Sequence, residues 1–238
     1  DLGLPAAQER LLREVVAVGK PTILVLQSGS AVAVPWAAEH VDAVLMAWYG
    51  GEEAGTALAE VLFGDAGPAG RLPVTVYASA DDLPPFESYD MEGRTYRFFR
   101  GTPLYPFGFG LSYTRFEYRD LRITPGAIEP EGEAEVSVEV ANVGEVAGDE
   151  VVQLYVTDPE ASVPVPLRQL QGFRRITLEP GATERVVFTL QPGQLVCYAD
   201  DGAAMVEPGR FILSVGGGQP IPGGAASECV SGELEVTA

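Results

Sequence analysis

Residues 134–157 read AEVSVEVANVGEVAGDEVVQLYVT, two stretches of alternating apolar and polar side chains on either side of the turn Asn142-Val143-Gly144. Alternation with a period of two residues is typical of a β-strand that has one buried and one exposed face. The sequence therefore predicts strands over residues 134–142 and 149–157.

The same alternation recurs through the C-terminal half, at residues 116–124, 168–178, 183–190 and 210–215. Turn sequences separate these stretches: Glu179-Pro180-Gly181, Gln191-Pro192-Gly193 and Glu207-Pro208-Gly209. Six or seven short strands in about 120 residues indicate an immunoglobulin-like or fibronectin-type β-sandwich. No tryptophan lies beyond Trp48, so the Cys…Trp…Cys pattern of antibody domains is missing. We expect a fibronectin type III-like domain over residues 116–238.

The first 80 residues have a different pattern. Residues 8–18 carry apolar side chains at near-helical spacing between Pro5 and Gly19, which predicts a helix with both stop signals. Short apolar runs at 22–26 and 41–48 suit buried strands, and an alanine-rich helix is expected at 53–62. Strands and helices that alternate at short spacing indicate a parallel sheet covered by helices.

This α/β part has few strands. Two are clear and a third is expected at residues 72–77, whereas a doubly wound domain normally has about five or six. Residues 1–5 also lead directly into a helix, with no strand before it. We therefore expect residues 1–80 to be part of an α/β sandwich whose first strands are missing, and the chain to be an incomplete protein.

Residues 81–115 form the expected linker and interface loop, which is rich in Pro, Gly, Tyr and Phe. Unstructured stretches of more than about 15 residues are uncommon in compact domains and are usually functional. Charged and aromatic side chains alternate within it: Glu87, Tyr89, Asp90, Glu92, Arg94, Tyr96, Arg97, Phe98, Phe99 and Arg100. Such a mixture can bind sugar hydroxyls but equally suits a domain interface, which we favour. Glu92 and Arg94 are the candidate substrate-binding residues.

The charge of the chain excludes one class of partner. Thirty-four acidic residues against 15 basic ones give a formal charge of −19, which repels phosphate backbones. No apolar run approaches the roughly 20 residues of a membrane span. We expect a protein that binds neither nucleic acid nor membrane.

Candidate catalytic and metal-binding residues are sparse. Ser28 lies in a sequence that does not match a nucleophile elbow, and the only histidine, His40, is expected at a surface or interface. Glu52 and Glu53 precede a helix, where carboxylates favour the helix dipole and can cap its amides; Glu53 as a general acid is the less favoured interpretation. With one histidine and two cysteines, the sequence predicts no metal and no cofactor.

The two cysteines, Cys197 and Cys229, lie in the same half of the chain. They are too few for a disulfide scaffold, although a single bridge between them is possible. Two free thiols in a reducing compartment are favoured, because cysteine is often simply a small core residue.

Several longer motifs resemble the C-terminal region of glycoside hydrolase family 3. They are Gly19-Lys20-Pro21, Ser28-Gly29-Ser30-Ala31, the stretch 45–55, Val61-Leu62-Phe63-Gly64-Asp65, the stretch 68–75 (PAGRLPVT) and the stretch 106–113 (PFGFGLSY). The likeness covers nearly the whole chain. Residues 82–86 (DLPPF) and 93–99 (GRTYRFF) are similar to the branch with β-xylosidases and α-L-arabinofuranosidases, more than to the β-glucosidase branch.

The resemblance implies an activity and a partner. Members are retaining exo-glycosidases, which use two carboxyl groups, and their architecture is a (β/α)₈ barrel, an α/β sandwich and often a fibronectin-like domain. The resemblance places the nucleophilic aspartate in the barrel and the acid/base glutamate in a loop before the segment that resembles residues 1–5. We therefore expect no catalytic residue in this chain, and we expect the remainder of the enzyme, as another chain or segment, and an oligosaccharide substrate as partners.

We thus expect the chain to be the C-terminal portion of a xylan 1,4-β-xylosidase, an enzyme that hydrolyses terminal β-xylosyl residues. A β-glucosidase is the alternative within the family. A non-catalytic carbohydrate-binding or scaffold fragment is the alternative of another class. The compartment stays open between cytoplasm and secretion by a bacterium, with the cytoplasm slightly favoured.

Overall fold

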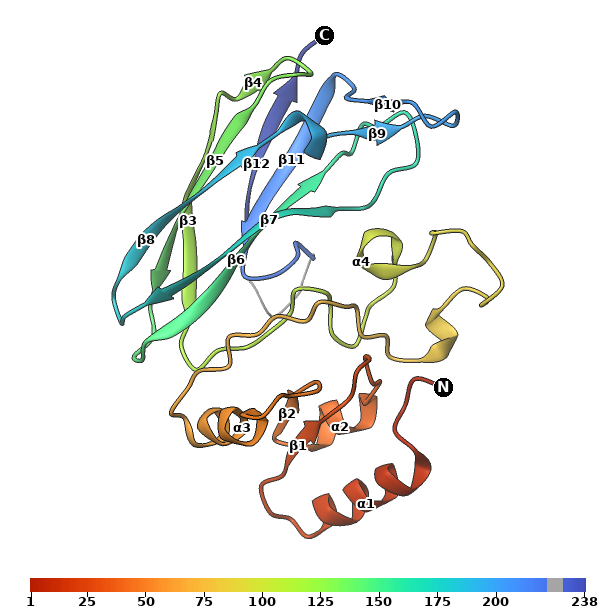
Figure 1. The fold of residues 1–238 in the computed structure, drawn as a ribbon, viewed down its shortest axis with the longest axis vertical. Coiled ribbons are helices and arrows are strands. Elements are labelled where there is room, and N and C mark those ends of the chain that lie inside the picture. The colour runs from red at the N-terminus through yellow and green to blue at the C-terminus, as the bar shows by residue number, and fades with distance from the viewer. Residues whose placement is uncertain (222–228) are drawn as a thin grey trace. The chain divides into compact units, whose positions relative to one another are not determined.

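The computed structural model describes residues 1–221 and 229–238, which form two compact units (Figure 1). Unit 1 comprises Asp1–Ala66 and Val74–Pro106, and unit 2 comprises Gly67–Pro73 and Phe107–Ala238. This division differs from the expected ranges 1–80, 81–115 and 116–238, because the chain passes between the units three times.

Unit 1 is an α/β structure with a small parallel sheet. Strands β1 (Ile23–Leu26) and β2 (Ala43–Met46) pair in parallel, with Ile23 opposite Ala43. Three helices accompany them: α1 (Ala6–Ala17), α2 (Pro35–His40) and α3 (Ala54–Phe63). The short helices η1 (Ala80–Asp82) and α4 (Thr95–Phe98) lie in the segment after them. The predicted alternation of helices with two parallel strands is confirmed.

Local signals explain the helix ends in unit 1. Pro5 occupies the N-cap of α1, and Gly19 has a φ of 73°, a left-handed conformation that glycine adopts without strain. Gly64 ends α3 with a φ of 85° in the same way. Helix α2 was not predicted, although Pro35 at its first turn was a usable signal.

The prediction of a third strand at residues 72–77 is wrong. Only Val76 makes a β-bridge, to Tyr105, with N–O distances of 2.9 and 3.1 Å. Leu72 instead belongs to unit 2, and Pro73 has no N–H to continue a ladder. The apolar run at 72–77 is thus divided between two units.

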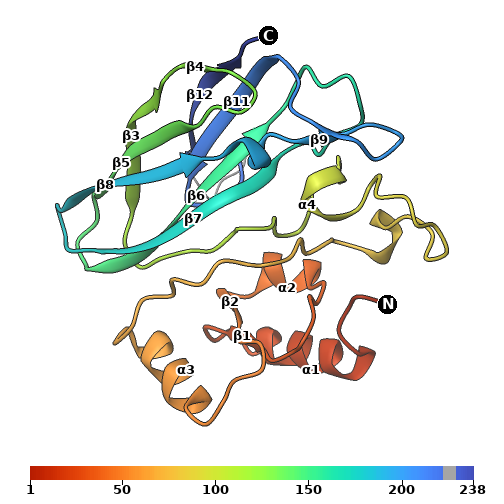
Figure 2. The ribbon, with the colours of Figure 1, turned by 45° about the horizontal axis from the view of Figure 1, so that its top comes forward.

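Unit 2 is a β-sandwich (Figures 1 and 2). One sheet has the order β4-β12-β11-β6-β7, and the other has the order β3-β5-β8. Their bounds are β3 (Phe116–Thr124), β4 (Ala127–Ile128), β5 (Ala134–Asn142), β6 (Gly148–Thr157), β7 (Gln169–Leu178), β8 (Thr183–Leu190), β11 (Gly209–Gly216) and β12 (Cys229–Val236). The helix η2 (Pro192–Gln194) precedes a short hairpin, β9 (Cys197–Tyr198) with β10 (Ala204–Met205).

All six predicted strands of this half are present, and their inward positions form its core. Val136, Val138 and Val140 of β5 are fully buried, as are Val152 and Leu154 of β6. Strand β12 was not predicted, because glycine at position 232 and acidic residues on both sides of Leu234 weaken its pattern. Cys197 is buried and Cys229 is partly buried, and no disulfide joins them.

Candidate functional site

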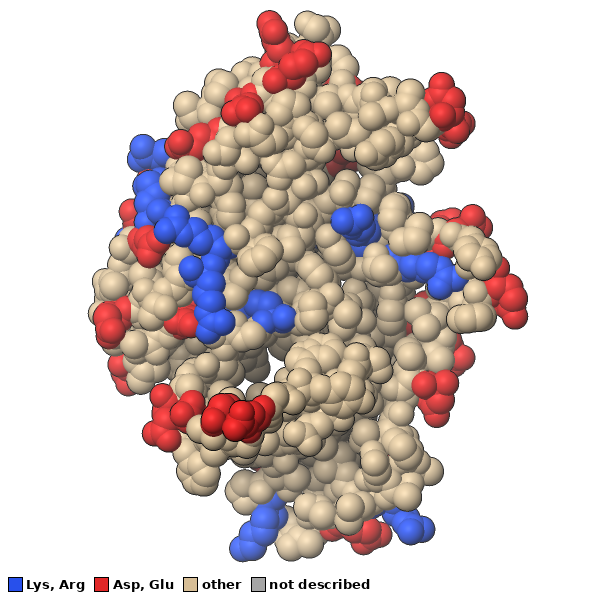
Figure 3. Space-filling view, viewed as in Figure 1, with Lys and Arg blue, Asp and Glu red and all other residues tan. Residues whose placement is uncertain are grey.

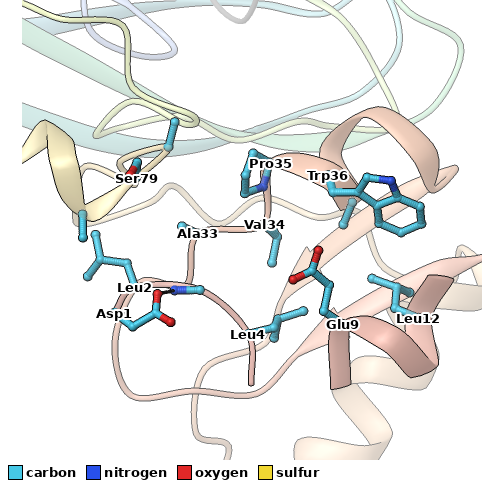
Figure 4. A pocket seen from close by; sticks show the side chains of 14 residues that line it. Asp1, Leu2, Leu4, Glu9, Leu12, Ala33, Val34, Pro35, Trp36 and Ser79 are labelled. Atoms are coloured by element: carbon cyan, nitrogen blue, oxygen red, sulfur yellow. Dashed lines mark hydrogen bonds between the residues drawn. The ribbon is translucent and has the colours of Figure 1, made fainter. Parts of the chain in front are cut away.

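A pocket of about 230 Å³ lies in unit 1, between α1, α2 and the segment before η1 (Figure 4). Asp1 and Glu9 supply its carboxylates, Trp36 its aromatic ring and Ser79 its hydroxyl. Carboxylates, aromatic rings and hydroxyls are groups that can bind a sugar, provided that other contacts of the protein do not already occupy them.

Contacts within unit 1 already engage most of these groups. Glu9 accepts a hydrogen bond from Arg13 at 2.5 Å, and the Arg13 guanidinium lies over the Trp36 ring at 4.2 Å. His40 stacks on the same ring at 4.4 Å, and its Nδ1 lies 2.8 Å from the Trp36 carbonyl. The Asp1 carboxylate accepts from the Gly3 amide at 3.0 Å. The two carboxylates and the Trp36 ring of the pocket are therefore already in contact with other groups of unit 1.

The other candidate catalytic residues have local roles. The Ser28 hydroxyl accepts a hydrogen bond from the Ser30 amide at 3.2 Å, and His40 is held by Trp36. Glu53 accepts from the Thr56 hydroxyl at 2.8 Å but caps no amide of α3, contrary to the expected capping. Glu9 was not among the predicted site residues, although it precedes Leu12 by three positions and therefore shares its helical face.

In the loop at residues 84–94, the Arg94 side chain is bound to the backbone, whereas the Glu92 side chain is exposed. Arg94 donates from Nε to the Asp90 carbonyl at 3.0 Å and from Nη2 to the carbonyls of Pro85 and Ser88 at 3.0 and 2.7 Å. Glu92 is exposed and does not pair with Arg94 in the described structure. Arg94 therefore holds the loop closed by binding its backbone, whereas the Glu92 carboxylate is left at the surface.

The closed loop presents two aromatic side chains to solvent. Phe86 is 95% exposed and Tyr89 is 99% exposed, with Glu87 and Asp90 beside them. Exposed aromatic side chains on a fixed loop are typical of a binding surface.

Replacing Arg94 with methionine should open this loop, because three backbone carbonyls would lose their donor. We expect chymotrypsin to cleave after Phe86 or Tyr89 several-fold faster in Arg94→Met than in the parent chain, as followed by mass spectrometry. Arg97→Met is the matched control, since the Arg97 guanidinium lies 5.9 Å from the Tyr96 ring and holds no loop carbonyl. Equal cleavage of both variants would contradict this role for Arg94.

In unit 2, the segments 67–73 and 107–113 contain most of two family-like motifs, and they lie side by side. The Leu72 amide donates to the Phe109 carbonyl at 2.8 Å, and the Gly108 amide donates to the Leu72 carbonyl at 2.7 Å. A Cβ on Gly110 would lie 2.2 Å from the Gly70 carbonyl oxygen, so the two backbones approach as closely as glycine permits.

A buried ion pair fastens the first segment to the sandwich. Arg71 donates from Nη2 to both carboxylate oxygens of Glu150 at 3.0 and 2.9 Å, and from Nε to the Gly217 carbonyl at 3.1 Å. The side chains are only 8% and 4% exposed. Burial raises the pKa of the Glu150 carboxyl above its usual value, while the Arg71 guanidinium acts in the opposite direction. Burial, with the Glu150 charge as a smaller cause, raises the pKa of Tyr118 well above normal.

Gln153 fastens the second segment. Its amide donates to the carbonyls of Gly108 and Gly217 at 3.1 and 2.8 Å, and its oxygen accepts from the Tyr155 hydroxyl at 2.6 Å. Both motifs are therefore structural, and the raised pKa of Glu150 reflects burial rather than acid catalysis. The sequence carried a signal for this, since Glu150 has the parity of the inward residues Val152 and Leu154 and a buried carboxylate needs a partner.

Arginine side chains gather over the outer strands of unit 2 (Figure 3). Arg174 pairs with Glu184 at 3.1 Å, and Arg185 pairs with Asp120. Paired arginines of this kind do not provide the unpaired basic surface that binds phosphate.

Nowhere in residues 1–221 and 229–238 do three or more His, Cys, Asp or Glu side chains gather as metal ligands would. In the same residues, no helix has the length and apolar character needed for a bilayer crossing.

Comparison with known proteins identifies both parts of the chain. Residues 1–113 match the glycosyl hydrolase family 3 C-terminal domain, and residues 150–219 match the fibronectin type III-like domain. These matches confirm the expected resemblance and the expected fold class, a partial α/β sandwich followed by a β-sandwich.

Three relatives illustrate the similarity. A β-xylosidase from Formosa agariphila is 44% identical over 221 residues, which cover 91% of this chain and 31% of that protein. A periplasmic β-glucosidase from Salmonella typhimurium is 36% identical over 228 residues, covering 91% and 30%. The solved structure of a β-glucosidase from Erythrobacter marinus matches with a TM-score of 0.86 at 36% identity, covering 99% of this chain and 31% of that one. The chain spans about a third of the length of these relatives. It belongs to glycosyl hydrolase family 3 and consists of that family's C-terminal domain followed by a fibronectin type III-like domain.

Proposed function

We propose that this chain is the C-terminal portion of a retaining, exo-acting glycoside hydrolase that releases terminal β-xylosyl residues from xylo-oligosaccharides. The observation that carries the proposal is the 44% identity to a β-xylosidase over 91% of the chain. The DLPPF and GRTYRFF sequences of the loop support the same substrate.

A retaining hydrolase needs two carboxyl groups about 5–5.5 Å apart. One attacks the anomeric carbon, and the other protonates the leaving oxygen and later activates water. In the described structure, Asp1, Glu9 and Glu150 are engaged by an amide or an arginine, which suits support rather than catalysis. We therefore propose that the nucleophilic aspartate and the acid/base glutamate lie in the part of the enzyme that these 238 residues do not include.

Glu92 and Arg94 remain our proposed substrate-binding residues, with separate roles. Glu92 is exposed and can accept hydrogen bonds from sugar hydroxyls. Arg94 is bound to three backbone carbonyls, so its proposed contribution is to position the loop that carries Glu92. Phe86 and Tyr89 add aromatic surface on the same loop.

Hydrolysis of p-nitrophenyl β-xyloside tests the proposal. We expect hydrolysis by the protein purified from its native source, with whatever polypeptide accompanies it, and none by the 238 residues produced alone. Turnover by the isolated residues would show that a catalytic carboxyl pair is present in this chain. A native protein that hydrolyses neither the xyloside nor the glucoside would leave a non-catalytic carbohydrate-binding or scaffold role.

A β-glucosidase is the second candidate, because the Salmonella typhimurium relative carries that name at 36% identity. The two candidates differ in whether the sugar has a hydroxymethyl group at C5, which a pocket discriminates by space and hydrogen bonding. Faster turnover of p-nitrophenyl β-glucoside than of the xyloside would favour this candidate.

A further inference from the structure

Unit 1 exposes more apolar surface than its size explains. Of the seventeen large hydrophobic side chains that are exposed in the described residues, eleven lie in unit 1, although it is the smaller unit. In the described residues, its core cluster has only four buried members: Leu12, Leu26, Val34 and Ala37. Large exposed apolar surfaces on a folded domain mark interaction sites.

Helix α1 concentrates this surface in a second apolar stripe. Its inner stripe, Leu12 and Val16, packs into the core. Leu11, Val15 and Val18 recur at intervals of four and three residues and are 65%, 45% and 70% exposed; we call them the outer stripe. At 3.6 residues per turn the two stripes lie roughly 120° apart, so one core cannot cover both. A helix that is apolar on two sides is built to be buried on two sides.

The strands and the third helix show the same incompleteness. The sheet of unit 1 has only β1 and β2, so each strand has one unpaired edge, and Ile23 of β1 is exposed. Parallel sheets normally occur with more strands and with both faces covered. No residue of α3 is buried, although Leu62 and Phe63 extend its apolar surface.

We infer that the outer stripe of α1 is the docking face for a further α/β layer of the same hydrolase, supplied by polypeptide outside these 238 residues. The inference rests on the proposed function, because it assumes that the chain works as part of a longer enzyme. The inference goes beyond that function by naming the surface of this chain to which the remainder of the enzyme binds.

Two observations select this occupant. The relatives are about three times as long as this chain, so each has additional polypeptide that could cover such a face. The outer stripe is purely aliphatic, which suits packing against another helix or strand, whereas a sugar site needs polar groups and aromatic rings. A second copy of the chain could cover the stripe, but it would not add the further layer that the small sheet lacks.

Thiol labelling of Val15→Cys tests the inference. The substitution is made in the gene at its own locus, and maleimide labelling of position 15 is followed by peptide mass spectrometry, which separates it from Cys197 and Cys229. We expect labelling at least about tenfold slower in the protein purified from its native source than in the 238 residues produced alone. Arg10→Cys, on the same helix but outside both stripes, is the matched control and should label equally in both preparations.

Each outcome decides the inference separately from the enzymatic activity. Equal labelling of Val15→Cys in both preparations would overturn it. So would protection that appears in the isolated chain and grows with its concentration, because a second copy would then cover the stripe. Absence of glycosidase activity in the same native preparation would reject the proposed function, whereas the labelling result does not depend on turnover.

Discussion

Replacing Arg71 with methionine is expected to lower the free energy of unfolding of unit 2 by about 3–5 kcal/mol at neutral pH. The variant leaves Glu150 as a buried carboxylate without its bidentate partner. It also removes one of the two donors to the Gly217 carbonyl, the other being Gln153. Urea unfolding followed by the circular dichroism of the β-sandwich measures the loss.

The loss in Arg71→Met should depend on pH in a definite direction. Burial already raises the pKa of Glu150 in the folded state, so the folded protein holds this proton more tightly than the unfolded chain and stability falls as pH rises through the interval between the two values. Without the Arg71 charge, the folded pKa of Glu150 rises further and the interval widens. Arg71→Met should therefore lower the free energy of unfolding less at about pH 5 than at neutral pH.

Two further variants separate the ion pair from simple packing. The double variant Arg71→Met/Glu150→Met should recover more than half of the loss, because a buried ion pair replaced by apolar groups of similar size is often neutral. Arg175→Met breaks the Arg175–Asp149 pair, in which the arginine is 60% exposed, and should cost no more than about 1 kcal/mol. An Arg71→Met variant no less stable than Arg175→Met would contradict the role of the buried pair.

Gly110→Ala is expected to destabilise unit 2 by about 3 kcal/mol, at the upper end of ordinary overpacking. The new methyl group would lie 2.2 Å from the carbonyl oxygen of Gly70 and 3.0 Å from two atoms of Arg71. The nearest atom is backbone, so no side-chain rotation relieves the contact. The segments 67–73 and 107–113 would have to separate, which would stretch the hydrogen bonds between Leu72 and its partners Gly108 and Phe109.

Gly70→Ala is the matched control, because a Cβ at position 70 meets nothing within 4 Å. It changes the same pair of segments by the same methyl group, and it should shift stability by no more than about 0.5 kcal/mol. Similar losses in the two variants would show that the close approach at Gly110 is unimportant.

The sandwich was largely predictable from the sequence because its core obeys a local rule. In β5, Val136, Val138 and Val140 are fully buried, as the alternation predicts, although Ser137 between them is buried too. Strand β6 departs further from the rule, since Gln153 and Tyr155 are buried on its other face beside Gly108. A covering segment from elsewhere in the chain cannot be read from a strand's own pattern.

The candidate site was less predictable because its contacts join residues that are distant in sequence. The motifs around Arg71 and Gly108 were recognised, but their partners Glu150 and Gln153 lie 79 and 45 residues further along. Arg94 was predicted as a substrate-binding residue, and its guanidinium binds the backbone of its own loop, a contact that its residue type does not reveal. Composition indicates which bonds a side chain can make, whereas the fold decides which partner it meets.

The place of β12 has a consequence for synthesis. This strand comes last among the strands, yet it lies inside the five-stranded sheet, with β11 on one side and β4 on the other, and it pairs Val236 with Ile128 more than a hundred residues earlier. Such distant pairings form slowly, because the entropy of closing a long loop is lost before any new contact stabilises the chain. On the ribosome, the edges of β11 and β4 must therefore stay unpaired until residues 229–236 leave the exit tunnel, and during that time they are open to pairing with other nascent chains.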